Sequence, residues 1–456
     1  MIQTVTTRLT GGSYNSPNLL GKLYPATDIT YNTEANAAVA TLSSSTTPLN
    51  GDYWFWYVAP DDFTESINSS DVNQSERVVM VHVTTTYVDG TSDDLELPIK
   101  IVRPPLLLVH GLAGDPTTWD HFTFNNGTLF KNSFLWKQKH VLELFKHAYF
   151  ADNANYILSP DNTNYHIPEH RLNTLQGNIE ALRSQGYACN QVDYVCHSMG
   201  GCVLRTAATF FSNKFFGEGG SPYKNYGKGF IHKIVTLNTP HGGSPVADAI
   251  TEFIPEAPTY INFFLNSVYK IAGNKTPLIG DFIEPIQPGN LFSEWKSTDA
   301  VRDLQVSGDA GGETLLETKV KYHLIAGDID GPSSNAWAEL DKYLELVEQV
   351  FKVMRSFAQG PAKTYLTGLL LLDKATRSVA FLDWYSQQKG YPDFFADGDM
   401  IVPLKSQLAG LAANSSTVSV FHNTNMWKNA RHTSIQKRDD VGTRVFDLLN
   451  QPITST

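Results

Sequence analysis

The chain is poor in features that would point to membrane or nucleic-acid-binding proteins. Its longest apolar stretches, such as YLTGLLLL at 365–372, fall far short of the roughly 20 residues that a membrane-spanning helix needs. Basic side chains are also outnumbered, with 35 Lys and Arg against 46 Asp and Glu and a formal net charge of -11. Without a Lys/Arg run to contact phosphates, nucleic acid is not expected as a partner, and no transmembrane segment is predicted.

Cysteine is scarce as well. The three cysteines are Cys189, Cys196 and Cys202, and the first two flank a predicted strand that would hold them roughly 23 Å apart, against a disulfide limit of about 7 Å. We therefore interpret the cysteines as small buried residues and exclude a disulfide framework or a thiolate metal site. The start, MIQTVTTRLTGGS, lacks the charged and apolar regions of a secretory signal, so we expect such a signal to be absent or removed. The low charge and abundant Thr, Ser, Asn and Tyr favour an exported protein.

The length of 456 residues indicates two or three folded units. Residues 1–103 contain β-branched and aromatic runs separated by Gly, Asp, Asn and Ser clusters, namely AAVATL, DYWFWYVAP, RVVMVHVTTTYV and LELPIKIV. This pattern predicts a small antiparallel β-sandwich that resembles an immunoglobulin-like module. The prolines after Arg103 stiffen the connection and mark the boundary.

Residues 104–456 alternate apolar strands with amphipathic helices, which predicts an α/β domain with a parallel sheet covered on both faces. We expect strands at 105–110, 191–197, 232–238, 320–327 and 416–422, and a terminal helix at about 438–450. Two stretches interrupt the alternation, at about 244–298 and 331–390, and carry large apolar residues at helical spacing. They are either ordinary packed helices or a movable cap or lid with an acyl-binding inner face.

A serine stands between the strand-like VDYVCH and the helix-compatible segment that follows Gly200 and Gly201. A sharp turn from strand to helix exposes a serine hydroxyl and requires small neighbours, because strand and helix almost touch. The segment CHSMGG resembles the G-x-S-x-G nucleophile elbow of α/β-hydrolases, in the form common among lipases and esterases. It departs from the pattern at Cys196, where that family usually has glycine. The resemblance implies an α/β-hydrolase fold with Ser198 as the nucleophile.

Two further segments resemble lipase sequences. PPLLLVHGLAG (104–114) is similar to the segment in which a strand ends in His-Gly, which implies an oxyanion hole formed by the backbone N–H groups of Leu112 and Met199. TLNTPHGGS (236–244) resembles the segment that precedes the lid, and it places a histidine in the pocket wall. The pocket-lining residues implied by these resemblances are His110, Gly111, His197 and His241.

The acid and the base should follow the nucleophile in the order Ser, Asp/Glu, His. DGDMIVPLKSQ (397–407) resembles the lipase segment that carries the acid, and Asp399 occupies the matching position, with Asp397 and Asp330 as alternatives. The base is expected in the loop before the terminal helix, where His432 lies. His422 is the alternative, although it should end the preceding strand.

The resemblance implies a carboxylic-ester hydrolase that forms an acyl-enzyme, either a lipase or a long-chain esterase acting on lipid or another hydrophobic ester. Three alternatives remain, which are a short-chain carboxylesterase, a polyester hydrolase and a non-catalytic surface-binding protein on a hydrolase scaffold. The mechanism requires no cofactor. Related lipases sometimes hold a structural calcium or zinc ion, but no ligand set can be named from this sequence.

Overall fold

The computed structural model describes about half of the chain, with parts of both predicted regions. The described residues are 2–11, 20–26, 41–44, 54–63, 73–112, 114–123, 135–145, 148–158, 172–210, 229–253, 298–306, 320–328, 389–390, 398–399, 401–422, 430, 432 and 435–451. The predicted insertions at about 244–298 and 331–390 lie largely outside these residues, so the cap or lid stays a prediction.

A six-stranded sheet forms the centre of the second region, and its strand order is β12-β11-β10-β9-β7-β8. Every described pair in it is parallel. The strands are β7 (Leu106–Val109), β8 (Lys139–Leu142), β9 (Val192–His197), β10 (Ile231–Leu237), β11 (Lys321–Asp328) and β12 (Val418–His422). The five predicted strands are confirmed within one or two residues at each end. Strand β8 was not predicted, because this short edge strand is only partly buried and lacks a continuous apolar run.

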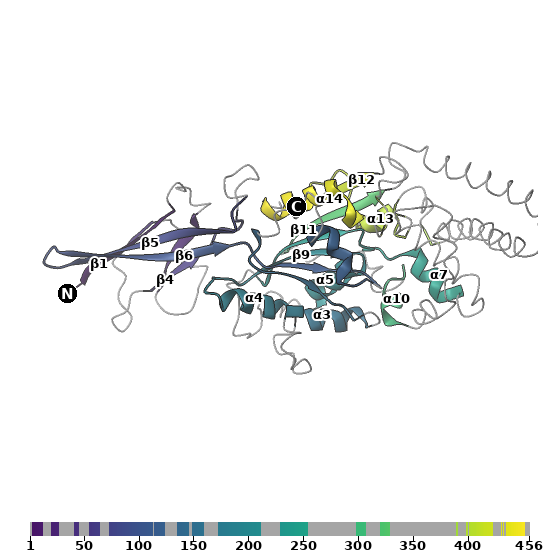
Figure 1. The fold of residues 1–456 in the computed structure, drawn as a ribbon, viewed down its shortest axis with the longest axis horizontal. Coiled ribbons are helices and arrows are strands. Elements are labelled where there is room, and N and C mark those ends of the chain that lie inside the picture. The colour runs from purple at the N-terminus through teal and green to yellow at the C-terminus, as the bar shows by residue number, and fades with distance from the viewer. Residues whose placement is uncertain are drawn as a thin grey trace, which may run out of the picture.

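Helices cover both faces of this sheet (Figure 1). One face carries α3 (Phe150–Leu158), α4 (Leu175–Arg183), α5 (Met199–Phe210), α7 (Pro245–Phe253), α10 (Asp299–Asp303) and α13 (Leu404–Gln407). The other face carries the short helices η2 (Pro116–Trp119), α2 (Asp120–Thr123) and η7 (Ile435–Lys437), and the terminal helix α14 (Asp439–Asn450). Helix α14 confirms the predicted terminal helix. None of the helices in the described parts of the chain has the length and apolar character needed to cross a bilayer.

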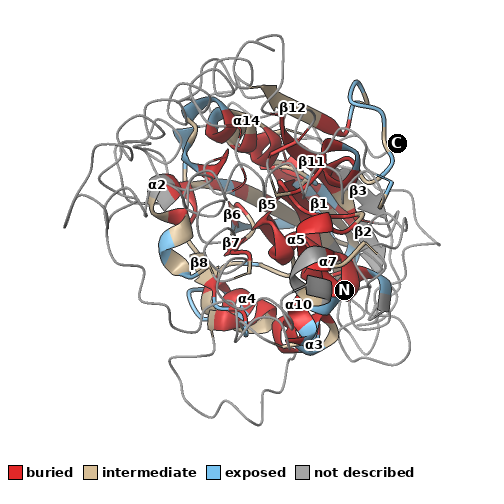
Figure 2. Cartoon of the chain, turned by 90° about the vertical axis from the view of Figure 1, so that its right-hand side faces the viewer, coloured by how far each residue is buried: buried red, intermediate tan, exposed pale blue. Residues whose placement is uncertain are grey.

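Burial on both faces explains why the central strands read as continuous apolar runs. All of β9 and all of β10 are buried, as Figure 2 shows for the interior of this region. Alternate side chains of β9 enter opposite cores: Tyr194 and Cys196 pack on the α5 side, and Val195 packs on the α14 side. Strand β9 is therefore anchored from both sides directly before Ser198.

A separate antiparallel β region precedes the α/β region. Its four-stranded sheet has the order β3-β1-β5-β6, and a second sheet pairs β2 with β4. The strands are β1 (Ile2–Thr10), β2 (Lys22–Ala26), β3 (Thr41–Ser44), β4 (Trp54–Val58), β5 (Glu76–Tyr87) and β6 (Ser92–Val102). Leu9, Leu23, Val79 and Val81 share one small core between the sheets. Strands β1 and β2 were not predicted, and the likeness to an immunoglobulin domain stays a prediction.

Buried polar contacts join the β region to the α/β region. The Arg103 guanidinium lies 4.3 Å from the ring centroid of Phe63, and its Nε donates to Asn450 Oδ1 at 2.9 Å. Lys233 of β10 forms an ion pair with Asp62, and its side chain is completely buried. Together these contacts connect the β region, the central sheet and the end of α14.

Candidate active site

Ser198 lies in the turn between β9 and α5, in a backbone conformation that is unusual for serine. Its φ is 55°, a left-handed value that costs energy for residues with a Cβ atom. Two hydrogen bonds hold the turn: Ser198 N–H donates to Leu237 O at 3.0 Å, and Gly201 N–H donates to Ser198 O at 3.0 Å. The strained conformation is thus maintained by the neighbouring strand and by the first turn of the helix.

Three glycines allow the backbone to approach this turn closely. A Cβ atom at Gly111 would lie 2.5 Å from Ser198 Cβ and 3.0 Å from Ser198 Oγ. At Gly200 it would lie 2.7 Å from His110 O, and at Gly201 it would lie 2.2 Å from Thr239 Oγ1. Real Cβ atoms do not come this close to such neighbours, so glycine is required at these positions for steric reasons.

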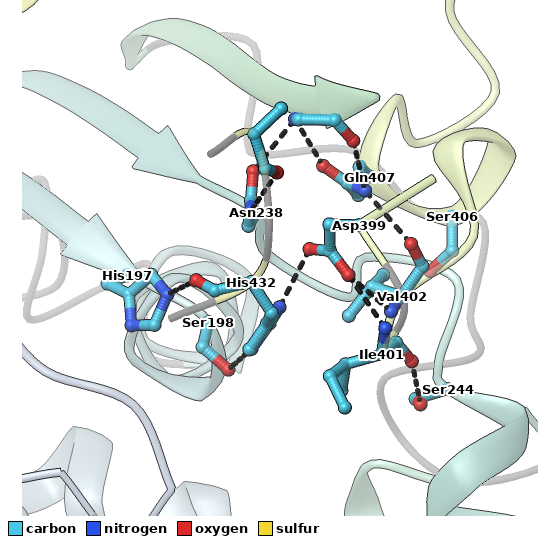
Figure 3. A network of polar contacts seen from close by, with 12 residues as sticks. His197, Ser198, Asn238, Ser244, Asp399, Ile401, Val402, Ser406, Gln407 and His432 are labelled. Carbon is cyan, nitrogen blue, oxygen red and sulfur yellow. Dashed lines mark hydrogen bonds and ion pairs between the residues drawn. The ribbon is translucent and has the colours of Figure 1, made fainter. Parts of the chain in front are cut away.

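The structure brings Ser198, His432 and Asp399 into one chain of hydrogen bonds (Figure 3). His432 Nε2 is 2.7 Å from Ser198 Oγ, and His432 Nδ1 is 2.7 Å from Asp399 Oδ2. The carboxylate can only accept, which places the imidazole proton on Nδ1 and leaves Nε2 to accept from the serine hydroxyl. These three residues are far apart in the sequence and meet at the carboxyl ends of the parallel strands.

Asp399 is held rigidly by its own loop. Its Oδ1 accepts hydrogen bonds from the backbone N–H groups of Ile401 at 2.9 Å and Val402 at 2.7 Å. A β-bridge between Gly398 and Pro403 closes the loop. The side chain is fully buried, and both carboxylate oxygens accept from N–H donors, so the aspartate is fixed towards the imidazole.

The alternative base, His422, takes no part in this arrangement. Asp397 and Asp330 lie outside the described residues. His422 ends β12, as expected, and its Nδ1 pairs with Asp328 Oδ2 at 3.0 Å. Its side chain is 41% exposed, which places it at the sheet edge, away from the buried chain of hydrogen bonds.

The loop after β7 lies beside the serine. His110 is buried, its Nδ1 is 2.9 Å from Gly111 O, and its Nε2 accepts from Leu144 N–H at 3.2 Å. These two bonds fit one neutral tautomer and fix the loop against the chain that follows β8. Leu112 follows the close contact between Gly111 and Ser198, and Met199 is the first residue of α5, where helix N–H groups lack intrahelical partners.

Comparison with known proteins gives a family match to part of the chain and distant matches to solved structures. Residues 101–267 match the family model PGAP1, described as a PGAP1-like alpha/beta domain. Similar solved structures include the mature form of Bacillus licheniformis lipase BlEst2, at 15% identity over 76% of this chain and 93% of that chain, with a TM-score of 0.37. Another is the rice cell wall degrading esterase LipA from Xanthomonas oryzae, at 13% identity over 82% and 90%, with a TM-score of 0.33. A Bacillus megaterium epoxide hydrolase in complex with an inhibitor shows 11% identity over 82% and 98%, with a TM-score of 0.25. No curated protein matches the chain.

The second region is an α/β domain in which helices cover both faces of a six-stranded parallel sheet. Its departure from the usual elbow, Cys196, is accommodated because the side chain points into the α5-side core, where it is fully buried. All three cysteines are free thiols, and Cys196 and Cys202 are buried as expected, whereas Cys189 is only partly buried. Burial raises the pKa of Cys189 to about 12 and that of Cys202 to about 11, and burial also holds the pKa of Cys196 well above its ordinary value. Thiolate formation is therefore disfavoured at all three cysteines.

The two remaining predicted pocket residues are buried histidines with different partners. His197 Nε2 donates to the backbone carbonyl of His432 at 2.6 Å, and burial, followed by the nearby charge of His432, lowers the pKa of His197 to about 3. His241 Nε2 is 3.3 Å from Thr236 Oγ1, and burial with the nearby Arg205 charge lowers the pKa of His241 well below 6.5. Both rings are neutral at ordinary pH.

Sequence reasoning did not identify two polar residues, Asn238 and Gln407, that support the loop of Asp399. Gly327 N–H donates to Asn238 Oδ1 at 2.8 Å and to Gln407 Oε1 at 2.9 Å, and Gln407 Nε2 donates to Val402 O at 2.9 Å (Figure 3). Asn238 has a φ of 50°, a conformation that asparagine tolerates better than most residues. The only signal in the sequence was the polar residue that ends a predicted strand.

The segment before the first insertion is tied to the same acid loop. Ser244 Oγ donates to Ile401 O at 2.6 Å, and Ser406 Oγ donates to Gly243 O at 2.6 Å. These two hydrogen bonds connect the end of the segment TLNTPHGGS to the loop that carries Asp399. Among the described residues, no group of three or more His, Cys, Asp or Glu side chains gathers in a way that could hold a metal ion.

Proposed function

We propose that this protein is a serine hydrolase that cleaves carboxylic esters through an acyl-enzyme, and that it acts as a lipase or long-chain esterase. The observation that carries the proposal is the continuous hydrogen bonding from Ser198 Oγ through His432 to Asp399, with 2.7 Å at both contacts. In the proposed mechanism Ser198 is the nucleophile, His432 is the general base and acid, and Asp399 orients the imidazole. A hydroxyl, an imidazole and a carboxylate in this order form the nucleophilic unit of serine hydrolases.

In the first step, His432 Nε2 takes the Ser198 proton while Oγ bonds to the ester carbonyl carbon. Asp399 stays deprotonated and stabilises the imidazolium through its bond to Nδ1–H. The imidazolium then gives its proton to the leaving alcohol, which produces the acyl-enzyme. Water, activated by the same imidazole, attacks the acyl carbonyl and releases the acid and free Ser198.

Negative charge develops on the carbonyl oxygen in both steps. The backbone N–H groups of Leu112 and Met199 are proposed to donate to this oxyanion, each contributing about 3 kcal/mol to the transition state. Supporting observations are the close approach of Gly111 to Ser198 and the position of Met199 at the start of α5. Because the donors are backbone groups, substitution of either side chain should change the rate little.

The first experiment compares Ser198→Ala with Ser184→Ala on a chromogenic acyl ester. Ser184 is an exposed serine whose Oγ bonds only locally, to Ala181 O at 3.0 Å. Turnover should fall about 1000-fold or more in the first variant and stay unchanged in the second. A fluorophosphonate should label the parent at Ser198 and leave the alanine variant unlabelled. Substantial turnover by a folded Ser198→Ala protein contradicts the proposal, and an inert parent chain favours the surface-binding alternative.

A second experiment addresses the substrate. The apolar side chains of the two insertions favour long acyl chains, so rates should rise with acyl length and increase when the substrate forms an emulsion. Esters of graded chain length, assayed below and above their solubility limit, measure both effects. A preference for soluble short esters without an interfacial gain indicates a short-chain carboxylesterase, and release of acid from a solid polyester film indicates a polyester hydrolase.

A further inference from the structure

His197 immediately precedes the proposed nucleophile, yet its side chain contacts the other end of the site. It is the last residue of β9, and it is 5% exposed. Its Nε2 lies 2.6 Å from the carbonyl oxygen of His432, and the two imidazole rings have centroids 5.0 Å apart. Figure 3 shows the ring beside the backbone of His432, on the side away from Asp399.

The protonation state of His197 is determined by its partner and its surroundings. A carbonyl oxygen only accepts hydrogen bonds, so Nε2 carries a proton. Burial and the positive charge that forms on His432 both oppose a second proton on this ring, and they lower its pKa to about 3. The ring is therefore a neutral donor with one tautomer, and its bond to His432 O is kept at ordinary pH.

His432 has little support from regular secondary structure, because it lies in a loop between β12 and η7. Its backbone is held from two sides: its N–H donates to Asp399 O at 3.1 Å, and its carbonyl accepts from His197. The first bond belongs to the acid loop, and the second belongs to the strand that carries Ser198. The second bond thus connects the backbone of the base directly to the nucleophile strand.

We propose that His197 is a positioning residue, whose hydrogen bond to the carbonyl of His432 fixes the imidazole at reacting distance from Ser198 Oγ. This inference rests on the proposed function and extends it by one residue. Without the bond, the loop that carries His432 could shift relative to β9, and the contact between Nε2 and Oγ would lengthen. Misplacement of a catalytic group by about 1 Å can cost roughly 100-fold in rate.

Three substitutions separate positioning from simple packing. His197→Gln keeps a donor near the position of Nε2, whereas His197→Asn carries the same amide on a side chain that is one methylene shorter and falls short of the carbonyl. His197→Phe keeps the ring volume and loses the donor. We expect kcat to fall about 10- to 100-fold in the Asn and Phe variants and to stay within about 3-fold of the parent in the Gln variant.

The Michaelis constant and covalent labelling provide the decisive readouts. KM should stay within about 2-fold in all three variants, because the side chain of His197 is buried and its hydrogen bond goes to the backbone of the base. The rate of fluorophosphonate labelling at Ser198 should fall in parallel with kcat, since labelling depends on the same activation of the hydroxyl. A structural role alone would lower thermal stability without this split between kcat and KM, and without rescue by Gln.

The inference is overturned if the Asn variant keeps the kcat of the Gln variant, or if Gln loses as much activity as Asn. The Gln and Asn pair decides the question even if the Phe variant fails to fold. Ser198→Ala, assayed beside them, separates the two hypotheses. Activity in Ser198→Ala defeats the proposed function, whereas an inactive Ser198→Ala with an unaffected His197→Asn defeats only the positioning role.

Discussion

Replacement of Asp62 by alanine should destabilise the whole protein, although Asp62 lies in the β region. Its carboxylate pairs with Lys233 of β10, whose side chain is 0% exposed. The same ammonium donates to Leu448 O at 3.1 Å and Gln451 O at 2.6 Å, at the end of α14. Removing the aspartate therefore leaves a buried positive charge whose remaining partners are neutral carbonyl groups.

The magnitude follows from the balance of these interactions. Removing one partner of a buried ion pair costs about 3–5 kcal/mol, because the other charge remains desolvated. The negative end of the α14 dipole offsets part of this cost, by up to about 2 kcal/mol in a partly buried site. We expect about 3 kcal/mol, a large fraction of the roughly 5–15 kcal/mol by which a typical domain is stable.

Denaturant unfolding, followed by circular dichroism and tryptophan fluorescence, measures this change. The matched control is Asp299→Ala, which removes an ion pair with Arg302 on the surface, where both side chains are more than half exposed; its cost should stay below about 1 kcal/mol. The double variant Asp62→Ala, Lys233→Met should be more stable than Asp62→Ala alone, because no charge is left buried. An Asp62→Ala cost no larger than the control would refute the reasoning.

Three other outcomes are expected. Gly111→Ala should lower ester hydrolysis at least about 100-fold and should also lower the melting temperature, because the new Cβ would lie 2.5 Å from Ser198 Cβ and one of the two must move. Steady-state rates of the folded variant and melting temperatures check this, and an unimpaired rate contradicts the close approach. The three thiols should not react with a disulfide reagent at about pH 8 in the folded protein and should all react in denaturant, because burial raises their pKa values. Thermal stability should decrease as the pH falls from about 6.5 to about 4, because burial lowers the pKa of His197 to about 3 and that of His323 to about 4, so only the unfolded chain gains these protons. Melting temperatures across this range test the sign, and the slope should be smaller in His197→Gln.

Strands with strong local signals were predictable, and those without them were not. Strands β9, β10 and β11 are long, apolar and buried on both faces, so their residues identify them without knowledge of their neighbours. Strand β8 is a short edge strand, and its Lys139 and His140 are only partly buried. Its pairing with β7 depends on the sheet that is already there. Strand β1 likewise has an alternating pattern that acquires meaning only from its antiparallel neighbours β3 and β5.

Some residues of the candidate site could be identified from the local sequence, and others only from the structure. Ser198 could be located because a strand, a serine and two glycines occur within one short segment. Asp399 and His432 could be proposed from the order of the segments, but His432 could be separated from His422 only by where each side chain lies. Asn238 and Gln407, which support the acid loop, carried no signal that distinguished them from other polar residues at the ends of strands.

The amino-acid sequence by itself determined the parallel sheet, the sharp turn at Ser198 and the burial of Cys196 and Cys202. Each of these follows from the size, polarity and spacing of residues that are close along the chain. Tertiary structure alone decided that His197 donates to the carbonyl of His432 and that Asp62 neutralises Lys233. The physical reason is range: a hydrogen bond or a buried ion pair acts over about 3–4 Å. Only the folded chain decides which residues come that close.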